Sequence, residues 1–531
     1  MKRNNTEQFK VIYLGVVILF CFTSNLYAQY IDQYPISASN AKKMVDIGNL
    51  QEAVRQYESL LEEEPNNIEY KHLLGKSYSL SYIDRQKGLT LLEEVFASSN
   101  RPEGVENDLA IAFFKSYQFA KAKKHFQQLL SKSTSEEDKK KYQNWISQCD
   151  RSSKMKEMEN YNISFENLGK EVNSNAPDYL PYVSYDESQI TFTTRREGVV
   201  GNLYDYGGYR TADIYMAKNG NKAYRKARSV GSPNTYGNEQ TGGQSENGQY
   251  LIYNVNSEEH FNNLFVSEKG KRSYMPPKVF GSDKINTNSD EMGGTLTNDG
   301  SRLYFCSNRE GGLGGFDIYW TQRLPNGEWG EIKNIGPPIN TPKNEQYPLF
   351  SDNGETLYFS SDGHLGMGDM DLFKSKWNHE SKTWSEPVNL GCPINSVDDD
   401  LNISFAGNTR YAYMAKSRDD GFGDLDIYRL TFHEERSEYT LFEGRIMNSD
   451  SSMVDTDVLI EIFDLSTEEL FGSYLMDKQK GVFHAILSPG KYRIEIINTV
   501  GYKDFEQKVT VMGKNYFKPK RSLPIILEQG N

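Results

Sequence analysis

Five short segments of the chain repeat one pattern, in which an acid or amide is followed by an aliphatic and then an aromatic residue. The segments begin at Asp213, Asn263, Asp317, Asp371 and Asp426, at steps of 50, 54, 54 and 55 residues. A carboxylate can transfer a proton, bind a cation or anchor a neighbouring segment. Because one active site needs one set of groups, a carboxylate that recurs in four of the five copies indicates a structural role.

Two of these acids follow an arginine at the same spacing. Arg309 lies eight residues before Asp317, and Arg418 lies eight residues before Asp426. A charge-assisted hydrogen bond between a guanidinium and a carboxylate can tie two strands together. We therefore predict an Arg–Asp ion pair inside these repeats.

Calcium binding is the alternative for the acid-rich segments. Aspartates lie close together at Asp369 and Asp371, at Asp424 and Asp426, and at 398–400. Calcium requires roughly six to eight converging oxygen ligands, and spacing alone does not establish that these oxygens converge. We predict no metal or cofactor, with calcium as the open alternative.

No catalytic motif is complete in the sequence. The nearest match to the Gly-x-Ser-x-Gly of serine hydrolases, at 243–248, misses by one residue. The glycines at 311–315 lack the Lys-Ser/Thr pair of a phosphate-binding loop, and the seven histidines show no metal-ligand spacing. We therefore predict that the protein is not an enzyme.

The recurring acids belong to an internal repeat of about 54 residues. A second motif, a glycine shortly before Asn-Ser or Asn-Thr, recurs at Gly169, Gly231, Gly281, Gly336 and Gly391. In the copy at 344–391, segments at 346–351, 356–360, 371–375 and 384–390 predict four short antiparallel strands. Four such strands per repeat are typical of one blade of a β-propeller.

The order of the two motifs predicts how the ring of blades closes. One outer strand, at 162–169, precedes every Asp-type strand, and the last Asp-type strand, at 426–430, has no outer strand after it. An open strand edge leaves backbone groups unpaired. We expect 162–168 to pair with 426–430 and to close five blades, with six as the alternative. The domains on either side would then lie close together and form one surface.

Residues 35–150 carry apolar residues at helical spacing. The recurring apolar positions include Ala53, Tyr57, Leu60, Leu74, Gly75, Tyr78, Ala110, Phe113, Ala122, Phe126 and Leu129. Small residues at such positions let helices approach closely. The pattern predicts paired helices.

From residue 439 the apolar spacing alternates as in strands. The alternating sets are Val458, Ile460 and Ile462, and Tyr492, Ile494 and Ile496. The segment at 488–490 predicts a hairpin turn between strands at 483–487 and 491–496. Several short strands in this region predict a small β-sandwich.

The first 28 residues predict a cleaved export signal. Basic residues at positions 2, 3 and 10 flank an apolar run at 11–22, which is too short for a stable membrane span. Cleavage is expected between Ala28 and Gln29, and Phe20 before Cys21 argues against lipid attachment. The alternative is an uncleaved N-terminal anchor.

Charge and cysteine content limit the partners. Without residues 1–28, the chain carries 57 basic and 72 acidic residues, a net charge of −15. This charge argues against nucleic acid and anionic membrane surfaces. Cys149, Cys306 and Cys392 are odd in number and far apart, so no disulfide framework is implied.

Three parts of the chain resemble known families. The helical segments resemble tetratricopeptide (TPR) repeats, which implies a concave surface for a protein partner. The segments TNDGSRLYFCSNREGGLGGFDIY and SDNGETLYFSSDGHLGMGDMDLF resemble the WD40-like propeller repeats of bacterial envelope proteins. The motifs at 442–446 and 489–492 resemble the carboxypeptidase regulatory-like, transthyretin-like domain, which is not itself a peptidase.

The resemblances imply a multidomain chain. A signal peptide at 1–28 is followed by a TPR-like domain at 29–155, a propeller at 156–435 and a transthyretin-like β-sandwich at 436–531. This order resembles a group of periplasmic or outer-membrane-associated Bacteroidetes proteins, some tied to type IX secretion and gliding. An OmpA-like domain usually follows in that group. Here the sequence stops at Asn531, so we do not expect direct peptidoglycan binding.

The resemblance implies an exported scaffold or adaptor of the periplasm and outer membrane. Its expected partners are envelope or secretion-system proteins that bind the TPR and propeller surfaces. We expect no nucleic acid, no cofactor and no transmembrane span in the mature chain. The alternatives are a glycan- or peptide-binding propeller and, third, a hydrolase.

Overall fold

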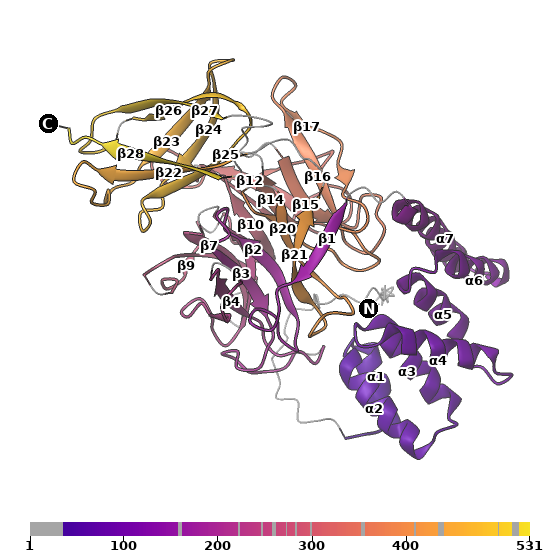
Figure 1. Cartoon of the computed structure of the whole chain (residues 1–531). Coiled ribbons are helices and arrows are strands. Elements are labelled where there is room, and N and C mark those ends of the chain that lie inside the picture. The colour runs from indigo at the N-terminus through magenta and orange to yellow at the C-terminus, as the bar shows by residue number, and fades with distance from the viewer. Residues whose placement is uncertain are drawn as a thin grey trace, which may run out of the picture.

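The computed structural model describes residues 35–530, except 158–161, 206, 221–222, 246–247, 258–261, 272, 282–283, 298–299, 352–355, 408–409, 434–439, 498 and 512–519. The predicted signal at 1–28, with Ala28 and Gln29, lies outside these residues. Along the described chain, helices come first, then a ring of antiparallel sheets, then two further sheets (Figure 1).

The N-terminal part of the described chain is helical, as the apolar spacing predicted. Its helices are α1 (Ala38–Asp46), α2 (Leu50–Glu63), α3 (Ile68–Leu80), α4 (Arg85–Ala97), α5 (Val105–Lys115), α6 (Phe119–Lys132) and α7 (Glu136–Glu157). The side chains of Asn49, Asn67 and Asp84 cap the first turns of α2, α3 and α4 by accepting backbone N–H bonds. None of the described helices combines the length and apolarity that a membrane crossing needs.

Consecutive helices pack around two apolar cores. Tyr57 and Leu60 lie in the core of the first three helices, and Phe113 and Phe126 lie in the core of the later ones. A β-carbon at Gly88 would lie 2.5 Å from the Ser79 backbone nitrogen, so α3 and α4 touch through their backbones at this point.

Five of the sheets formed by the described residues make the ring. In chain order their strands are β1 (Ile163–Asn167), β2 (Asp178–Val183), β3 (Gln189–Thr194), β4 (Asp213–Lys218), β5 (Arg228–Ser229), β6 (Asn238–Gln244), β7 (Tyr250–Asn256), β8 (Asn263–Glu268), β9 (Lys278–Val279), β10 (Glu291–Leu296), β11 (Arg302–Ser307), β12 (Asp317–Gln322), β13 (Lys333–Asn334), β14 (Glu345–Ser351), β15 (Thr356–Ser361), β16 (Asp371–Asn378), β17 (Thr383–Trp384), β18 (Val388–Asn389), β19 (Ser404–Phe405), β20 (Tyr411–Lys416) and β21 (Asp426–Phe432).

Each sheet of the ring is one antiparallel blade. The blades have the orders β2-β3-β4-β5, β6-β7-β8-β9, β10-β11-β12-β13, β14-β15-β16 with β17 and β18 both on β16, and β1-β21-β20-β19. An apolar core fills each of the five joints between neighbouring described blades. Blades arranged in this way make a β-propeller.

The ring closes through β1, as the sequence predicted. This strand pairs antiparallel with β21, from Ile163 opposite Phe432 to Asn167 opposite Tyr428. The closing blade therefore takes its outer strand from the beginning of the propeller and its other strands from the end. The described blades number five, which confirms the first choice of five over six.

The C-terminal part of the chain forms two sheets around one core. Its strands are β22 (Thr440–Asn448), β23 (Leu459–Asp464), β24 (Glu469–Leu475), β25 (Val482–Leu487), β26 (Gly490–Ile496), β27 (Phe505–Val511) and β28 (Lys520–Leu527). One sheet has the order β25-β22-β28, with β22 and β28 parallel, and the other has the order β24-β23-β26-β27. The alternating residues named above are buried between the sheets.

The predicted hairpin at 488–490 is wrong. β25 pairs with β22, whereas β26 pairs with β23 and β27, so this segment connects the two sheets. Apolar residues of β25 and β26 meet in the shared core, which places the strands in facing layers.

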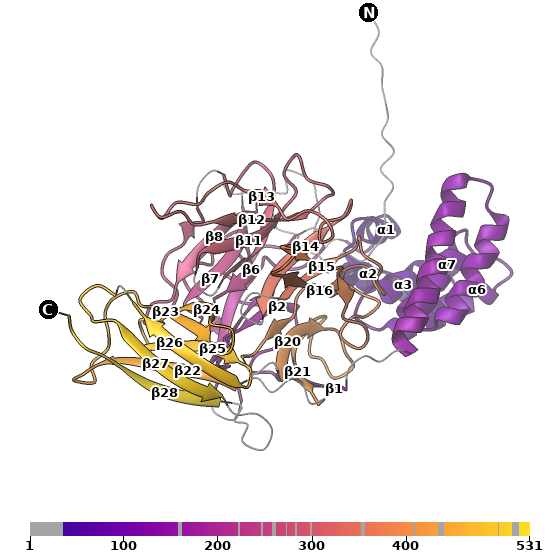
Figure 2. The same ribbon diagram turned by 90° about the horizontal axis from the view of Figure 1, so that it is seen from above.

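The expected joint surface of the two flanking domains is also wrong. Helices contact the loops between the second and third strands of blades, at Met367 and Asp424. The C-terminal sheets contact the other end of the ring, where Lys480 reaches Asp186 at 3.3 Å. Figures 1 and 2 show the ring between the two. The chain does enter and leave the ring at one end, but the helices fold back over the opposite end.

Candidate functional site at the covered end of the propeller

The recurring acids bind the backbone of the loops that precede their strands. Asp317 is fully buried, and its Oδ2 accepts a hydrogen bond from the Leu313 N–H at 2.5 Å. The same bond joins Met367 to Asp371 at 2.6 Å, Phe422 to Asp426 at 2.6 Å and Val200 to Asp213 at 3.0 Å. Asn263 begins β8 at the corresponding position.

The predicted Arg–Asp ion pairs do not form among the described residues. Arg309 donates instead to Glu291 at 3.1 Å. Arg418 lies over the Phe165 ring, 4.6 Å from its centroid, and its ion pair is with Asp420 at 3.7 Å. The prediction failed because backbone N–H groups bind the aspartates and because stacking on aromatic rings directs each guanidinium elsewhere.

A second carboxylate recurs at or just before the first strand of each described blade. Glu291 accepts hydrogen bonds from the Thr287 N–H at 2.9 Å and from its hydroxyl at 2.7 Å. The same two bonds join Ser174 to Asp178, Thr235 to Glu239, Thr341 to Glu345 and Ser396 to Asp400. Burial raises the pKa of each of these carboxyls.

The asparagine before each of these Ser or Thr residues binds the backbone of the preceding blade's third strand. Asn340 accepts from the Ile318 N–H at 2.9 Å and donates to the Ile318 carbonyl at 2.9 Å. The same bonds join Asn173 to Ile427, Asn234 to Ile214, Asn286 to Leu264 and Asn395 to Leu372. The Asn-Ser/Thr motif was evident from its spacing, whereas the acid four residues after each Ser or Thr, present in every copy, was not recognised as part of it.

Buried ion pairs join the helices to the ring. Lys115, at the end of α5, donates to Asp369 at 3.0 Å, to Asp398 at 3.1 Å and to the Val397 carbonyl at 2.6 Å. Arg85, at the start of α4, makes two bonds to Asp398 at 2.7 and 2.9 Å. Burial alone would raise the pKa of Asp398, but Arg85 and Lys115 together hold it well below its usual range.

The apolar part of this contact is centred on Met367. Its side chain is fully buried in the core formed by the later helices. Ser152 of α7 donates to the Met367 carbonyl at 2.9 Å, and Gln148 donates to the Gly368 carbonyl at 3.0 Å. One loop of the ring is therefore held by apolar packing, backbone bonds and ion pairs.

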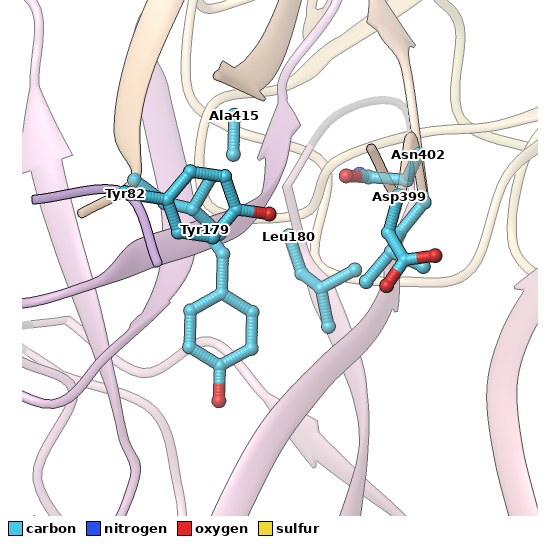
Figure 3. Close-up of a pocket in the computed structure, with 8 residues that line it drawn as sticks. Tyr82, Tyr179, Leu180, Asp399, Asn402 and Ala415 are labelled. Carbon is cyan, nitrogen blue, oxygen red and sulfur yellow. The ribbon is translucent and has the colours of Figure 1, made fainter. Parts of the chain in front are cut away.

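A cavity lies beside this contact. Its lining residues are Tyr82, Tyr179, Leu180, Asp399, Leu401, Asn402, Ala415 and Leu425. Tyr82 comes from the α3–α4 connection, and the other residues belong to the propeller. Figure 3 shows Tyr82 and Tyr179 on one side of the space and Asp399 and Asn402 on the other. Burial, followed by the charge of Asp369, raises the pKa of Asp399 well above its usual range.

The centre of the ring is filled by side chains. Tyr179, Leu180, Tyr182 and Tyr347 pack there in one cluster. On the side of the second and third blades the backbones touch, since a β-carbon at Gly243 would lie 1.7 Å from the Gly294 carbonyl oxygen. Among the described residues, a tyrosine-rich cluster and a close backbone approach therefore occupy the centre of the ring beside the cavity.

The aspartates considered for calcium have protein partners. Asp369 and Asp398 bind Lys115, Asp424 accepts hydrogen bonds from Gln51 and Tyr209, and Asp400 binds Lys416. Within the described part of the chain, no three His, Cys, Asp or Glu side chains are arranged to hold a metal ion. Cys149, Cys306 and Cys392 form no disulfide within the described part of the chain, and burial raises the pKa of the first two to about 12.

Comparisons with known proteins give structural likenesses only. No family model and no curated protein matches the chain. It resembles TolB from Acinetobacter baumannii, with 13% identity, a TM-score of 0.30 and coverage of 49% of this chain and 55% of that one. The chain thus spans little more than half the length of that protein.

Two further solved structures resemble the chain at a similarly low level of identity and TM-score. A putative TolB from Agrobacterium tumefaciens is 13% identical, with a TM-score of 0.29 and coverage of 61% of this chain and 97% of that one. An alpha-L-arabinofuranosidase from Lactobacillus brevis is 11% identical, with a TM-score of 0.34 and coverage of 52% and 93%. Likeness at this level carries no functional information, and the propeller assignment depends on the blade pairings and cores described above.

Proposed function

We propose that the protein is a non-catalytic scaffold or adaptor of the bacterial cell envelope. The observation that carries this proposal is that the helices cover part of one end of the ring, at the loops that carry Met367 and Asp424. Lys115 and Arg85 bind Asp398 across the contact with the helices, and tyrosines fill the ring centre. A hydrolase needs an accessible group of catalytic side chains, whereas a scaffold needs rigid domains with free outer surfaces.

The identities of the flanking domains belong to the same proposal. We assign the helices to a TPR-like domain and the two C-terminal sheets to a carboxypeptidase regulatory-like sandwich. Helices packed in consecutive pairs and two sheets around one core are consistent with both assignments. Export to the periplasm, association with the outer membrane and a link to type IX secretion or gliding rest on the sequence resemblance to Bacteroidetes proteins.

Cross-linking in intact cells tests the scaffold. The tagged full chain would be purified after cross-linking, and the co-purified proteins would be quantified against an untagged strain. We expect outer-membrane or secretion-system proteins in near-stoichiometric amounts. Turnover of glycosides or peptides by the purified protein, without recovery of such partners, would contradict the proposal.

A glycan- or peptide-binding propeller is the second candidate. The observation that favours it is the cavity, where two tyrosine rings face a carboxyl and an amide. Aromatic rings can stack on a sugar while polar groups fix its orientation. Retention of a glycan by the wild-type chain, lost on Asp399→Asn, would favour this candidate over the scaffold.

A further inference from the structure

One loop position recurs in several blades and has two different environments. The N–H groups of Leu313, Met367 and Phe422 donate to Asp317, Asp371 and Asp426 at 2.5, 2.6 and 2.6 Å. An apolar side chain therefore projects from the same point of the loop between the second and third strands in three blades.

The following glycines confirm that the three loops are equivalent. A β-carbon at Gly314 would lie 2.1 Å from the Lys343 carbonyl oxygen, and one at Gly368 would lie 2.5 Å from that of Asp398. At Gly423 the corresponding distance, to the Ala176 carbonyl oxygen, is 2.8 Å. Each loop thus rests on the segment that leads into the next blade, and only glycine fits there.

One of these loops already has a protein partner, the chain's own helices. Met367 is fully buried, whereas Leu313 is 47% exposed and Phe422 is 50% exposed. At Met367, an apolar helical surface accepts the side chain, α7 donates to the loop carbonyls, and Lys115 binds Asp369 and Asp398. This contact shows which kind of surface fits such a loop.

The charge beside Leu313 is opposite to the charge beside Met367. Lys343 occupies the position of Asp398, and Gly315 occupies the position of Asp369. Lys343 is exposed, and its Nζ donates to the Asp362 carbonyl at 2.8 Å. Asp362 directly follows β15, on the way to Met367, so the free loop adjoins the covered one.

We infer that the loop carrying Leu313 is the docking site for a helical segment of a partner protein. The partner surface offers an apolar pocket for Leu313 and, where the chain's own helices carry Lys115, an acidic side chain for Lys343. This inference rests on the proposed scaffold function and adds the chemistry of one partner. The partner is a protein other than a second copy of this chain. The chain's own Met367-binding surface carries Lys115 where the partner needs an acidic side chain, and Met367 already occupies it.

Site-specific photo-cross-linking in cells tests the inference. The full chain carries p-benzoylphenylalanine in place of Leu313, and the control carries it in place of Leu324, which is 44% exposed in the loop between β12 and β13 at the other end of the ring. We expect a cross-link from position 313 to a different protein, mapped to a helix with a nearby Asp or Glu, and none from position 324. Lys343→Glu in the same chain should lower the yield by about tenfold, because it reverses one interfacial charge.

Several results would overturn the inference. They are no product from position 313, a product with a second copy of this chain, equal products from positions 313 and 324, and a yield that Lys343→Glu leaves unchanged. If envelope proteins co-purify with the chain but position 313 forms no product, the docking site is wrong and the scaffold remains. If no protein co-purifies at all, the proposed function itself fails.

Discussion

Asn173 closes the propeller by binding both backbone groups of Ile427, 254 residues away. Its side chain accepts from the Ile427 N–H at 2.8 Å and donates to the Ile427 carbonyl at 3.0 Å. The same two bonds occur at the other described joints, so this contact makes the closing joint chemically equivalent to joints between consecutive blades. Because these bonds reach from one end of the propeller sequence to the other, they reinforce the backbone pairing of β1 with β21 that closes the ring.

Asn173→Ala should destabilise the propeller. It leaves the buried Ile427 N–H without a partner, whereas the Ile427 carbonyl keeps its bond from the Leu168 N–H at 3.2 Å. An unsatisfied buried donor costs about 1–3 kcal/mol, so we expect a loss of about 1–3 kcal/mol in the free energy of unfolding. Urea denaturation of the full chain measures it. Asn326→Ala, in an exposed turn where the side chain bonds Glu328, is the matched control and should change little. Equal stability of the two variants would contradict the closing role.

Asp317→Ala and Asp317→Asn should differ. The carboxylate accepts from the Leu313 N–H and from Asn334 at 2.8 Å. Alanine removes both bonds at a cost of about 1–3 kcal/mol, whereas asparagine keeps an oxygen that can accept; Asn263 occupies the same position of another blade. Thermal unfolding of both variants is the test. A stable Asp317→Ala variant would show that the loop does not need this anchor.

Asp371 should make stability depend on pH. Burial, followed by the charge of Asp400, raises the pKa of Asp371 to about 8 in the folded chain. Since the folded pKa lies above the unfolded one, the stabilisation is fully present below the unfolded pKa and is lost as the pH rises toward 8.

The variant Asp371→Asn removes this titration. Between pH 5 and pH 8 its free energy of unfolding should rise by up to about 4 kcal/mol relative to the wild type, because each pH unit between the unfolded and folded pKa corresponds to about 1.4 kcal/mol. Urea denaturation at the two pH values measures the difference. Glu239→Gln should behave in the same way, because burial raises the pKa of Glu239 to about 7. An unchanged pH dependence in both variants would contradict the burial of ionisable carboxyls at these joints.

Lys115→Met should loosen the helices from the ring. It leaves the buried carboxyl of Asp398 with one cation fewer, at a cost of about 3–5 kcal/mol for a broken buried pair. Limited proteolysis should then cut between α7 and β1 faster than in the wild type. Lys139→Met removes only the exposed pair with Glu136 and should have no effect on cleavage. Equal cleavage rates would mean that Lys115 does not hold the two parts together.

The repeat made the propeller predictable from the sequence. Each blade contributes one Asp-type strand and one Asn-Ser/Thr motif. An outer strand precedes the first Asp-type strand and none follows the last, so β1 was expected to pair with β21. The spacing of residues predicts the blades because each motif makes its contacts within one blade or with the adjacent blade.

Contacts between distant segments were not predictable in this way. Arg309 could have paired with several acids, and it is stacking on Phe305 and Tyr319 that directs it to Glu291. The position of the helices depends on Lys115 and aspartates more than 250 residues away. No spacing in the sequence reports such a contact.

The most direct test of the account compares the outer loop with the central cavity. Partner protein recovered per chain after cross-linking in cells would be measured for the wild type, Leu313→Asp and Asp399→Asn. If the chain acts by docking proteins, Leu313→Asp should lower the recovery by about tenfold, as loss of a central apolar contact does, and Asp399→Asn should match the wild type. If Asp399→Asn lowers the recovery of partner protein and Leu313→Asp leaves it at the wild-type level, the account is contradicted, and the partner binds at the cavity instead.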